Sequence, residues 1–165
     1  MEGRVKEKDI IELLEYNYLT FFKEFNSIDD KLLYAWPETE IYTGEWLTFG
    51  LYFKNQLILP NVDLCPKSIK ILDTIPSIVN AGFSILKPKT DIKPHVGYSN
   101  KVYRYHLGIN IPSSNPDNCA LCIYNPDIIK TWQNGKAFKF DDCKLHSAYN
   151  HTDKNRVILL IDVLK

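Results

Sequence analysis

The chain has 165 residues, and its 20 Lys and Arg side chains balance its 20 Asp and Glu side chains, so its formal net charge is zero. This length supports one well-buried core and is too short for two ordinary domains. The balanced charge, without a basic stripe, argues against nucleic acid as a partner. No apolar run approaches the roughly 18 residues of a membrane span, and the N-terminal segment MEGRVKEKD is too polar for a signal peptide. We therefore expect a soluble, cytoplasmic protein without a membrane span.

The spacing of apolar residues predicts an amphipathic helix over residues 8–27. A second, shorter helix is predicted over residues 65–75, because Pro66 stands near its first turn and Pro76 follows its end. The apolar residues that recur at intervals of three and four in the first helix are Ile11, Leu14, Tyr18, Phe21, Phe22 and Phe25. Their large side chains indicate that this helix packs on a broad apolar surface.

The rest of the chain has the texture of short strands separated by turns. Residues 45–53 are rich in aromatic side chains, which is typical of a strand, and from Ala81 onward apolar runs alternate with polar, turn-forming segments. The strands that we expect there are 82–87, 103–111, 119–125, 136–140 and 156–164, and the main separators are 87–94, 112–118, 132–135 and 141–155. This pattern predicts a mainly β jelly-roll barrel over residues 38–165, with a helical segment over residues 1–37, in a single domain.

The four cysteines of the chain are expected to be reduced thiols, because we find no secretory signal. Cys119 and Cys122 form a C-x-x-C pair inside a strand-like run, so their side chains should point to opposite faces. No second C-x-x-C completes a zinc site. We interpret both residues as ordinary strand residues.

Arginine is rare in this chain and occurs only at positions 4, 104 and 156. Arginine offers a rigid, bidentate fork for a carboxylate, which lysine cannot reproduce. Strand alternation places Arg104 and His106 on one face. Arg156 opens a strongly apolar strand, so its charge must meet an anion there, either a bound carboxylate or an aspartate, for which Asp141, Asp142 and Asp162 are candidates. Histidines near such an arginine indicate a metal site, and the combination is typical of oxygenases that use a 2-oxo acid.

Four stretches of the chain together resemble the aspartyl/asparaginyl β-hydroxylase family of Fe(II)- and 2-oxoglutarate-dependent dioxygenases. These stretches are FSILKPKTDIKPHVGYSN (83–100), YRYHLGINIP (103–112), WQNGKAFKFDDCKLHSAYN (132–150) and RVILLIDV (156–163). The resemblance extends over roughly residues 40–165. It implies a double-stranded β-helix, the barrel form of the jelly roll, and Fe(II), 2-oxoglutarate and O2 as cofactor and co-substrates.

The resemblance also implies roles for individual residues. His95 and His146 look like the two iron ligands, and with Arg156 they would be the catalytic residues. Arg156 and Ser84 are similar to the pair that binds the distal carboxylate of 2-oxoglutarate. Arg104 and His106 resemble residues near the other end of the co-substrate, although the carboxylate that Arg104 serves is left open.

Gly97 stands where most non-haem iron oxygenases have a third, carboxylate ligand, two residues after the first histidine. The family that the chain resembles shares this gap, which leaves an open coordination position. Asp141 and Asp142 are expected to be turn residues that stabilise the rim of the barrel, and not a replacement for the missing ligand.

The resemblance implies hydroxylation of an unactivated carbon, with release of succinate and CO2. Our first candidate is the β-carbon of an Asp- or Asn-like residue in a peptide or a small molecule. Three alternatives stay open: hydroxylation of an acyl chain, halogenation through the open iron position, and a metal-binding jelly roll without turnover. The oligomeric state is left open as well.

Overall fold

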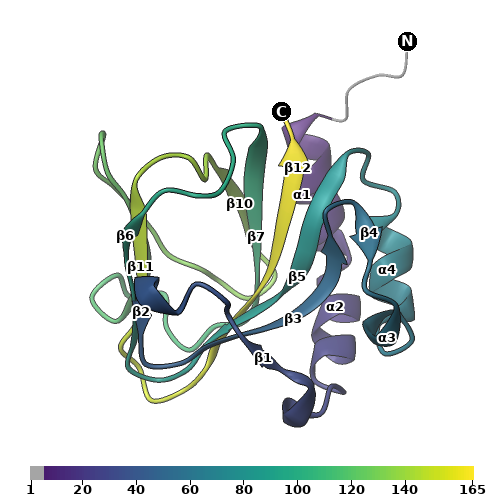
Figure 1. Ribbon diagram of the computed structural model, residues 1–165, viewed down its shortest axis with the longest axis horizontal. Coiled ribbons are helices and arrows are strands. Elements are labelled where there is room, and N and C mark those ends of the chain that lie inside the picture. Colours follow the sequence, from purple (N-terminus) through teal and green to yellow (C-terminus); the bar gives the residue numbers. More distant parts are fainter. Residues whose placement is uncertain (1–5) are drawn as a thin grey trace.

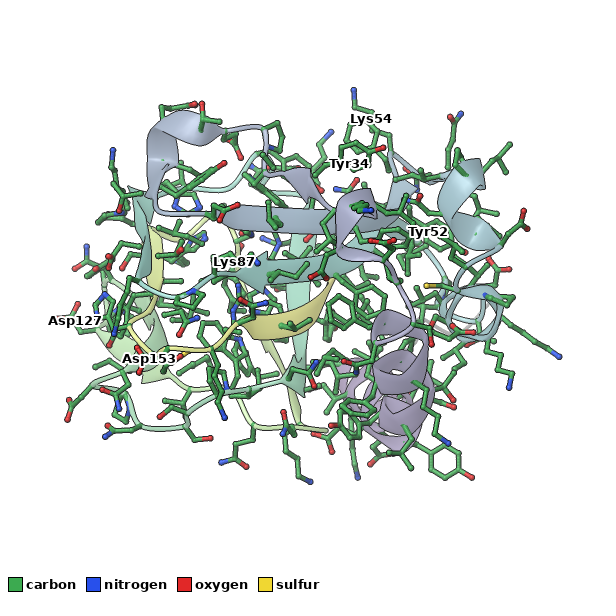
Figure 2. All side chains as sticks on the ribbon, turned by 90° about the horizontal axis from the view of Figure 1, so that it is seen from below. Tyr34, Tyr52, Lys54, Lys87, Asp127 and Asp153 are labelled. Atoms are coloured by element: carbon green, nitrogen blue, oxygen red, sulfur yellow. The ribbon has the colours of Figure 1, made fainter. Side chains whose placement is uncertain are left out.

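The computed structural model describes residues 6–165, and residues 1–5, where the polar N-terminal segment begins, lie outside the described part. Two antiparallel sheets face each other, and the helices cover the outer face of the larger sheet (Figure 1). Figure 2 shows the same layers from below, with Tyr52 on the helical side of the molecule and Asp127 and Asp153 on the opposite side, at the smaller sheet. The prediction of a mainly β jelly roll with helices packed on it is confirmed.

The larger sheet has its longest strands in the middle, and the expected strands 45–53, 82–87, 103–111, 136–140 and 156–164 all contribute to it. Its order is β1 (Tyr34–Ala35), β3 (Trp46–Phe53), β5 (Ile78–Leu86), β12 (Arg156–Leu164), β7 (Val102–Asn110) and β10 (Ala137–Phe140), with β4 (Gln56–Leu57) paired to β3. Because helices cover one face and the second sheet covers the other, β12 is buried on both sides, which explains its nearly continuous apolar sequence.

The smaller sheet consists of β2 (Tyr42–Thr43), β6 (Thr90–His95), β11 (His146–Asn150), β8 (Cys119–Ile123) and β9 (Ile128–Lys130). Two of these strands correct our expectation, because we predicted turn-forming segments there. β6 begins in the expected separator 87–94 and ends one residue after it, and β11 lies entirely within the expected separator 141–155. Their outer faces are polar, so neither has the apolar run that marks the strands of the larger sheet. Both strands end or begin at a histidine that the sequence assigns to the metal.

The predicted helix over residues 8–27 is two helices, α1 (Glu7–Tyr16) and α2 (Tyr18–Phe25). Asn17 ends the first helix: its side-chain Nδ2 donates to the carbonyl of Leu13 at 2.8 Å, competing with the helical backbone pattern. The apolar stripe is nevertheless maintained across the break, with Leu14 and Phe21 fully buried. The second predicted helix is present as α4 (Pro66–Leu72), preceded by the short α3 (Leu59–Val62), and two 3-10 turns occupy Asp30–Leu32 and Thr39–Ile41.

Two apolar layers result from the strand alternation of the larger sheet. On β12, Leu159 and Ile161 face the helices, whereas Ile158 and Leu160 face the smaller sheet. Arg156 has the same parity as Ile158, so it also points between the sheets. In the part of the chain that is described, none of the helices is both long enough and apolar enough to cross a membrane.

Candidate active site

All of the residues that the sequence assigns to metal and co-substrate line one cavity between the two sheets. The smaller sheet contributes His95 and His146, and the larger sheet contributes the others. The predicted residues around this cavity are Ser84, His95, Arg104, His106, His146 and Arg156. The remaining lining is mostly apolar or aromatic and includes Trp46, Trp132 and Phe140.

His95 and His146 are paired directly across β6 and β11, and their ring centroids are 4.4 Å apart. Nδ1 of His95 lies 2.8 Å from the carbonyl oxygen of Lys93, and Nδ1 of His146 lies 2.7 Å from that of Lys144. A carbonyl oxygen only accepts hydrogen bonds, so each Nδ1 carries a proton, and in the neutral ring the free lone pair is then on Nε2. This is the arrangement that metal-binding histidines require.

Burial is the main reason that the pKa of His146 is lowered to about 4. The imidazole is therefore neutral at neutral pH, as a metal ligand must be. Among residues 6–165, no group of three His, Cys, Asp or Glu side chains is placed to bind a metal ion. The donor set thus fits a metal with two histidine ligands from the protein and further positions for small ligands.

The side chain of Asp142 occupies the space that a side chain at position 97 would need. A Cβ atom on Gly97 would lie 1.7 Å from Oδ2 of Asp142 and 2.3 Å from its Cγ. Asp142 is fully buried, and its Oδ1 lies 3.5 Å from Nε2 of His146. The sequence places Asp142 on the rim, whereas the structure puts its carboxylate beside the second histidine. No sequence signal links residues 97 and 142, because the relation between them is purely spatial.

Arg104 lies between two buried carboxylates. Its Nη1 is 2.8 Å from Oδ1 of Asp142, and its Nε and Nη2 donate to Asp162 at 2.7 and 3.0 Å. Burial by itself would lower the pKa of Arg104, but Asp162 and Asp142 together act in the opposite direction and the pKa is raised. The assignment of Arg104 to the co-substrate stays a prediction, and the contacts observed here orient the Asp142 carboxylate.

Arg156, unlike Arg104, forms no salt bridge with a carboxylate in residues 6–165. Its Nη2 contacts Oγ of Ser84 at 3.4 Å, and its guanidinium carbon lies 4.7 Å from the ring centroid of Trp132. Its Nε is buried and has no hydrogen-bond partner in the described part of the chain. Burial lowers the pKa of Arg156 to about 10. A buried cation with a free donor is suited to an anion. The aspartates that the sequence left open have other partners, because Asp142 and Asp162 pair with Arg104 and Asp141 pairs with Lys165.

Ser84 and Trp46 complete this end of the cavity. Oγ of Ser84 accepts from Nε1 of Trp46 at 2.9 Å as well as from Arg156. Both lone pairs of the hydroxyl are then used, so its proton is available to an anion in the cavity. Trp46 is a residue whose contribution we did not predict, although its place in an aromatic strand was expected.

Two histidines with free Nε2 atoms and a buried arginine, around one cavity of a double-stranded β-helix, are the features of a non-haem iron oxygenase. The comparison with known proteins agrees with this class. Residues 11–165 match the family model described as Aspartyl/Asparaginyl beta-hydroxylase, and the chain belongs to this family. The match includes the N-terminal helices and so begins upstream of the roughly 40–165 that we expected.

The names of individual relatives refer to different substrates. The "Ornithine lipid ester-linked acyl 2-hydroxylase" of Rhizobium tropici is 39% identical over 73% of this chain and 42% of its own length. The "Aspartate beta-hydroxylase domain-containing protein 2" of Xenopus tropicalis is 32% identical over 97% of this chain and 45% of its own length. The chain therefore spans less than half the length of these two relatives.

The fold has a counterpart among solved structures. A crystal structure of an oxidoreductase of the 2OG-Fe(II) oxygenase family from Burkholderia pseudomallei has a TM-score of 0.65 at 8% identity. The similarity covers 90% of this chain and 79% of that one. At this identity the likeness concerns the fold alone, and it confirms the predicted double-stranded β-helix.

Proposed function

We propose that this chain is an Fe(II)- and 2-oxoglutarate-dependent hydroxylase whose dioxygenase domain spans residues 1–165, with the barrel over 38–165. One observation carries the proposal: a single cavity contains two histidines with free Nε2 atoms and a buried arginine that lacks an anionic partner among the described residues. The first pair is suited to a divalent metal, and the arginine is suited to a carboxylate.

Each residue then has a definite task. His95 and His146 bind the iron, and Arg156 with Ser84 binds the distal carboxylate of 2-oxoglutarate. His106 donates a hydrogen bond near the other end of the co-substrate. When bound, Fe(II), 2-oxoglutarate and O2 supply the oxidising power for inserting oxygen into an unactivated C–H bond, with release of succinate and CO2. The apolar lining keeps bulk water away from the reacting centre.

The carboxylate of Asp142 lies close to where a carboxylate ligand at position 97 would be. It lies in the space of a residue-97 side chain but is attached to the loop before β11. Burial raises the pKa of Asp142, while Arg104 acts in the opposite direction and favours the ionised form. We propose that the carboxylate of Asp142, held by Arg104, would supply negative charge beside a metal bound at His146.

The names of the relatives favour two substrates that share one chemical feature. The family is named for the β-carbon of Asp and Asn, which is bonded to the side-chain carbonyl carbon. The Rhizobium relative is named for position 2 of an ester-linked acyl chain, which is also bonded to a carbonyl carbon. We propose that the target is a methylene group next to a carboxyl-derived carbon. An Asp- or Asn-like residue is the first candidate, and an ester-linked acyl chain is the second.

The proposal is tested by a turnover assay with Fe(II), 2-oxoglutarate and O2. The purified protein is incubated with an Asp- and Asn-containing peptide or with an ester-linked acyl lipid, and succinate and the hydroxylated product are measured by mass spectrometry. We expect one substrate to gain an oxygen atom in step with succinate release, and the gain to be lost in His95→Ala. His151→Ala is the matched control, because His151 is exposed and outside the cavity.

The same assay separates the alternatives. A product that gains chlorine when chloride is added would identify a halogenase. Iron and 2-oxoglutarate binding without any substrate-stimulated succinate release, for either substrate, would contradict hydroxylase activity and favour a metal-binding protein without turnover.

A further inference from the structure

Trp132 contacts His106 and Arg156, two residues of the cavity that each have a buried nitrogen without a hydrogen-bond partner in the described part of the chain. It lies in the connection between β9 and β10, and it is only 1% exposed. Its indole Nε1 donates to Nδ1 of His106 at 3.2 Å, and the guanidinium carbon of Arg156 lies 4.7 Å from the centroid of its ring. One side chain thus positions two residues that come from different strands, β7 and β12.

The contact with the indole fixes the tautomer of His106. An indole nitrogen only donates hydrogen bonds, so Nδ1 of His106 must accept and cannot carry a proton. Burial lowers the pKa of His106 well below its ordinary value, so the ring is neutral. The single ring proton must then be on Nε2. That atom is buried and has no partner among residues 6–165, and His106 lines the cavity.

The three cavity histidines therefore divide into two kinds. His95 and His146 have a carbonyl oxygen at Nδ1, so their Nε2 atoms present lone pairs. His106 has an indole N–H at Nδ1, so its Nε2 presents a proton. A lone pair suits a metal cation, whereas an N–H suits a carboxylate. The partner of Nδ1 decides which of these ligands each histidine serves.

We propose that Trp132 is a positioning residue that makes His106 a hydrogen-bond donor to an anionic ligand in the cavity and orients Arg156 toward the same ligand. The identity of the ligand as 2-oxoglutarate rests on the proposed function. The tautomer of His106 does not, because it follows from the contacts of the protein alone. Trp132 does not touch the metal ligands in this scheme, so it affects the binding of the anion and not that of the metal.

The tautomer is measured on the metal-free protein by nitrogen NMR of labelled histidines, of which the chain has only four. We expect His106 to be neutral with its proton on Nε2, and we expect Trp132→Phe to produce a mixture of tautomers, because phenylalanine retains a ring but loses the N–H. Trp36→Phe is the matched control, since the indole of Trp36 donates to Glu38 outside the cavity. A wild-type His106 with its proton on Nδ1, or one that is doubly protonated at neutral pH, overturns the proposal.

The affinity for 2-oxoglutarate is measured anaerobically with Fe(II) bound. Trp132→Phe is expected to weaken this affinity about tenfold, the scale of a hydrogen bond to a charged group, with little change in the affinity for Fe(II). Trp36→Phe should change neither. Replacing His106 adds an independent test, because the amide nitrogen of Gln reaches the position of Nε2 and that of Asn reaches the position of Nδ1. His106→Gln should therefore bind 2-oxoglutarate more tightly than His106→Asn.

The outcomes distinguish the inference from the function on which it rests. A wild-type protein that binds Fe(II) but not 2-oxoglutarate contradicts the proposed function. Normal binding by the wild type, with equal affinity and an unchanged tautomer in Trp132→Phe, overturns the inference alone. If Trp132→Phe fails to fold, the wild-type tautomer and the comparison of Gln with Asn at position 106 still decide the question.

Discussion

Adding a single methyl group at position 97 tests the relation between Gly97 and Asp142. In Gly97→Ala, the new carbon would lie 1.7 Å from Oδ2 of Asp142, 2.3 Å from its Cγ and 2.8 Å from its carbonyl oxygen. The backbone cannot easily move away, because the N–H of Gly97 donates to the same carbonyl at 2.7 Å. The Asp142 side chain must therefore leave its place beside Arg104.

The expected loss of stability in Gly97→Ala has two sources, overpacking of a buried site and loss of the contact between Asp142 and Arg104. Overpacking a buried site typically costs about 1–3 kcal/mol. Losing one partner of a buried ion pair costs about 3–5 kcal/mol. Arg104 keeps its contacts with Asp162, which limits the second loss. We therefore expect Gly97→Ala to lower the free energy of unfolding by about 3 kcal/mol, which is roughly a hundredfold in the folding equilibrium.

The measurement is chemical denaturation of the metal-free protein, with Gly97→Ala made both in the wild type and in an Asp142→Gly background. The two closest clashes disappear in that background, and the contact with the carbonyl remains, so the cost of the methyl group should fall by more than half. An equal cost in both backgrounds would refute the reasoning, as would a cost in the wild type below about 0.5 kcal/mol. For the same reason, Gly97→Asp is expected to displace Asp142 and not to add a third ligand.

Two further predictions concern the co-substrate and pH. Arg156→Lys should weaken 2-oxoglutarate binding about thirtyfold, because lysine cannot form the bidentate contact, and the binding titration should show this without loss of thermal stability. The metal-free protein should lose about 3 kcal/mol of stability between pH 6.5 and pH 4, because the unfolded state takes up a proton at His146 in this range before the folded state does. Denaturation across this range should show a weaker pH dependence in His146→Gln, and an unchanged dependence in that variant would contradict the assignment.

The larger sheet was predictable from sequence because its strands are buried on both faces or rich in aromatic residues. β12 has a continuous apolar run, which correctly indicated that the strand opened by Arg156 is central and buried. The smaller sheet was harder to predict. In β6 the burial alternates, with Thr90 and Ile92 inside and Asp91 and Lys93 outside, but Asp91, Lys93 and Pro94 give it the composition of a turn.

The candidate site was predicted as a set of residues, and its internal contacts were not. Period-two alternation is enough to bring Arg104 and His106 to one face, and the cavity does contain both. The burial of Asp142 beside His146 depends on the absence of a side chain at position 97, which is far away in the sequence. The contact of Trp132 with His106 depends on how a loop between β9 and β10 folds back. Such relations have no periodicity, so a single sequence does not indicate them.

Anaerobic absorption spectroscopy of the protein titrated with Fe(II) and then with 2-oxoglutarate tests the central claim most directly. The account predicts a visible charge-transfer band that needs both ligands, disappears in His95→Ala and weakens in Arg156→Ala, while His151→Ala retains it. A correctly folded wild-type protein that gives no band, or a band that survives in His95→Ala, would contradict the claim that this cavity binds iron and 2-oxoglutarate together.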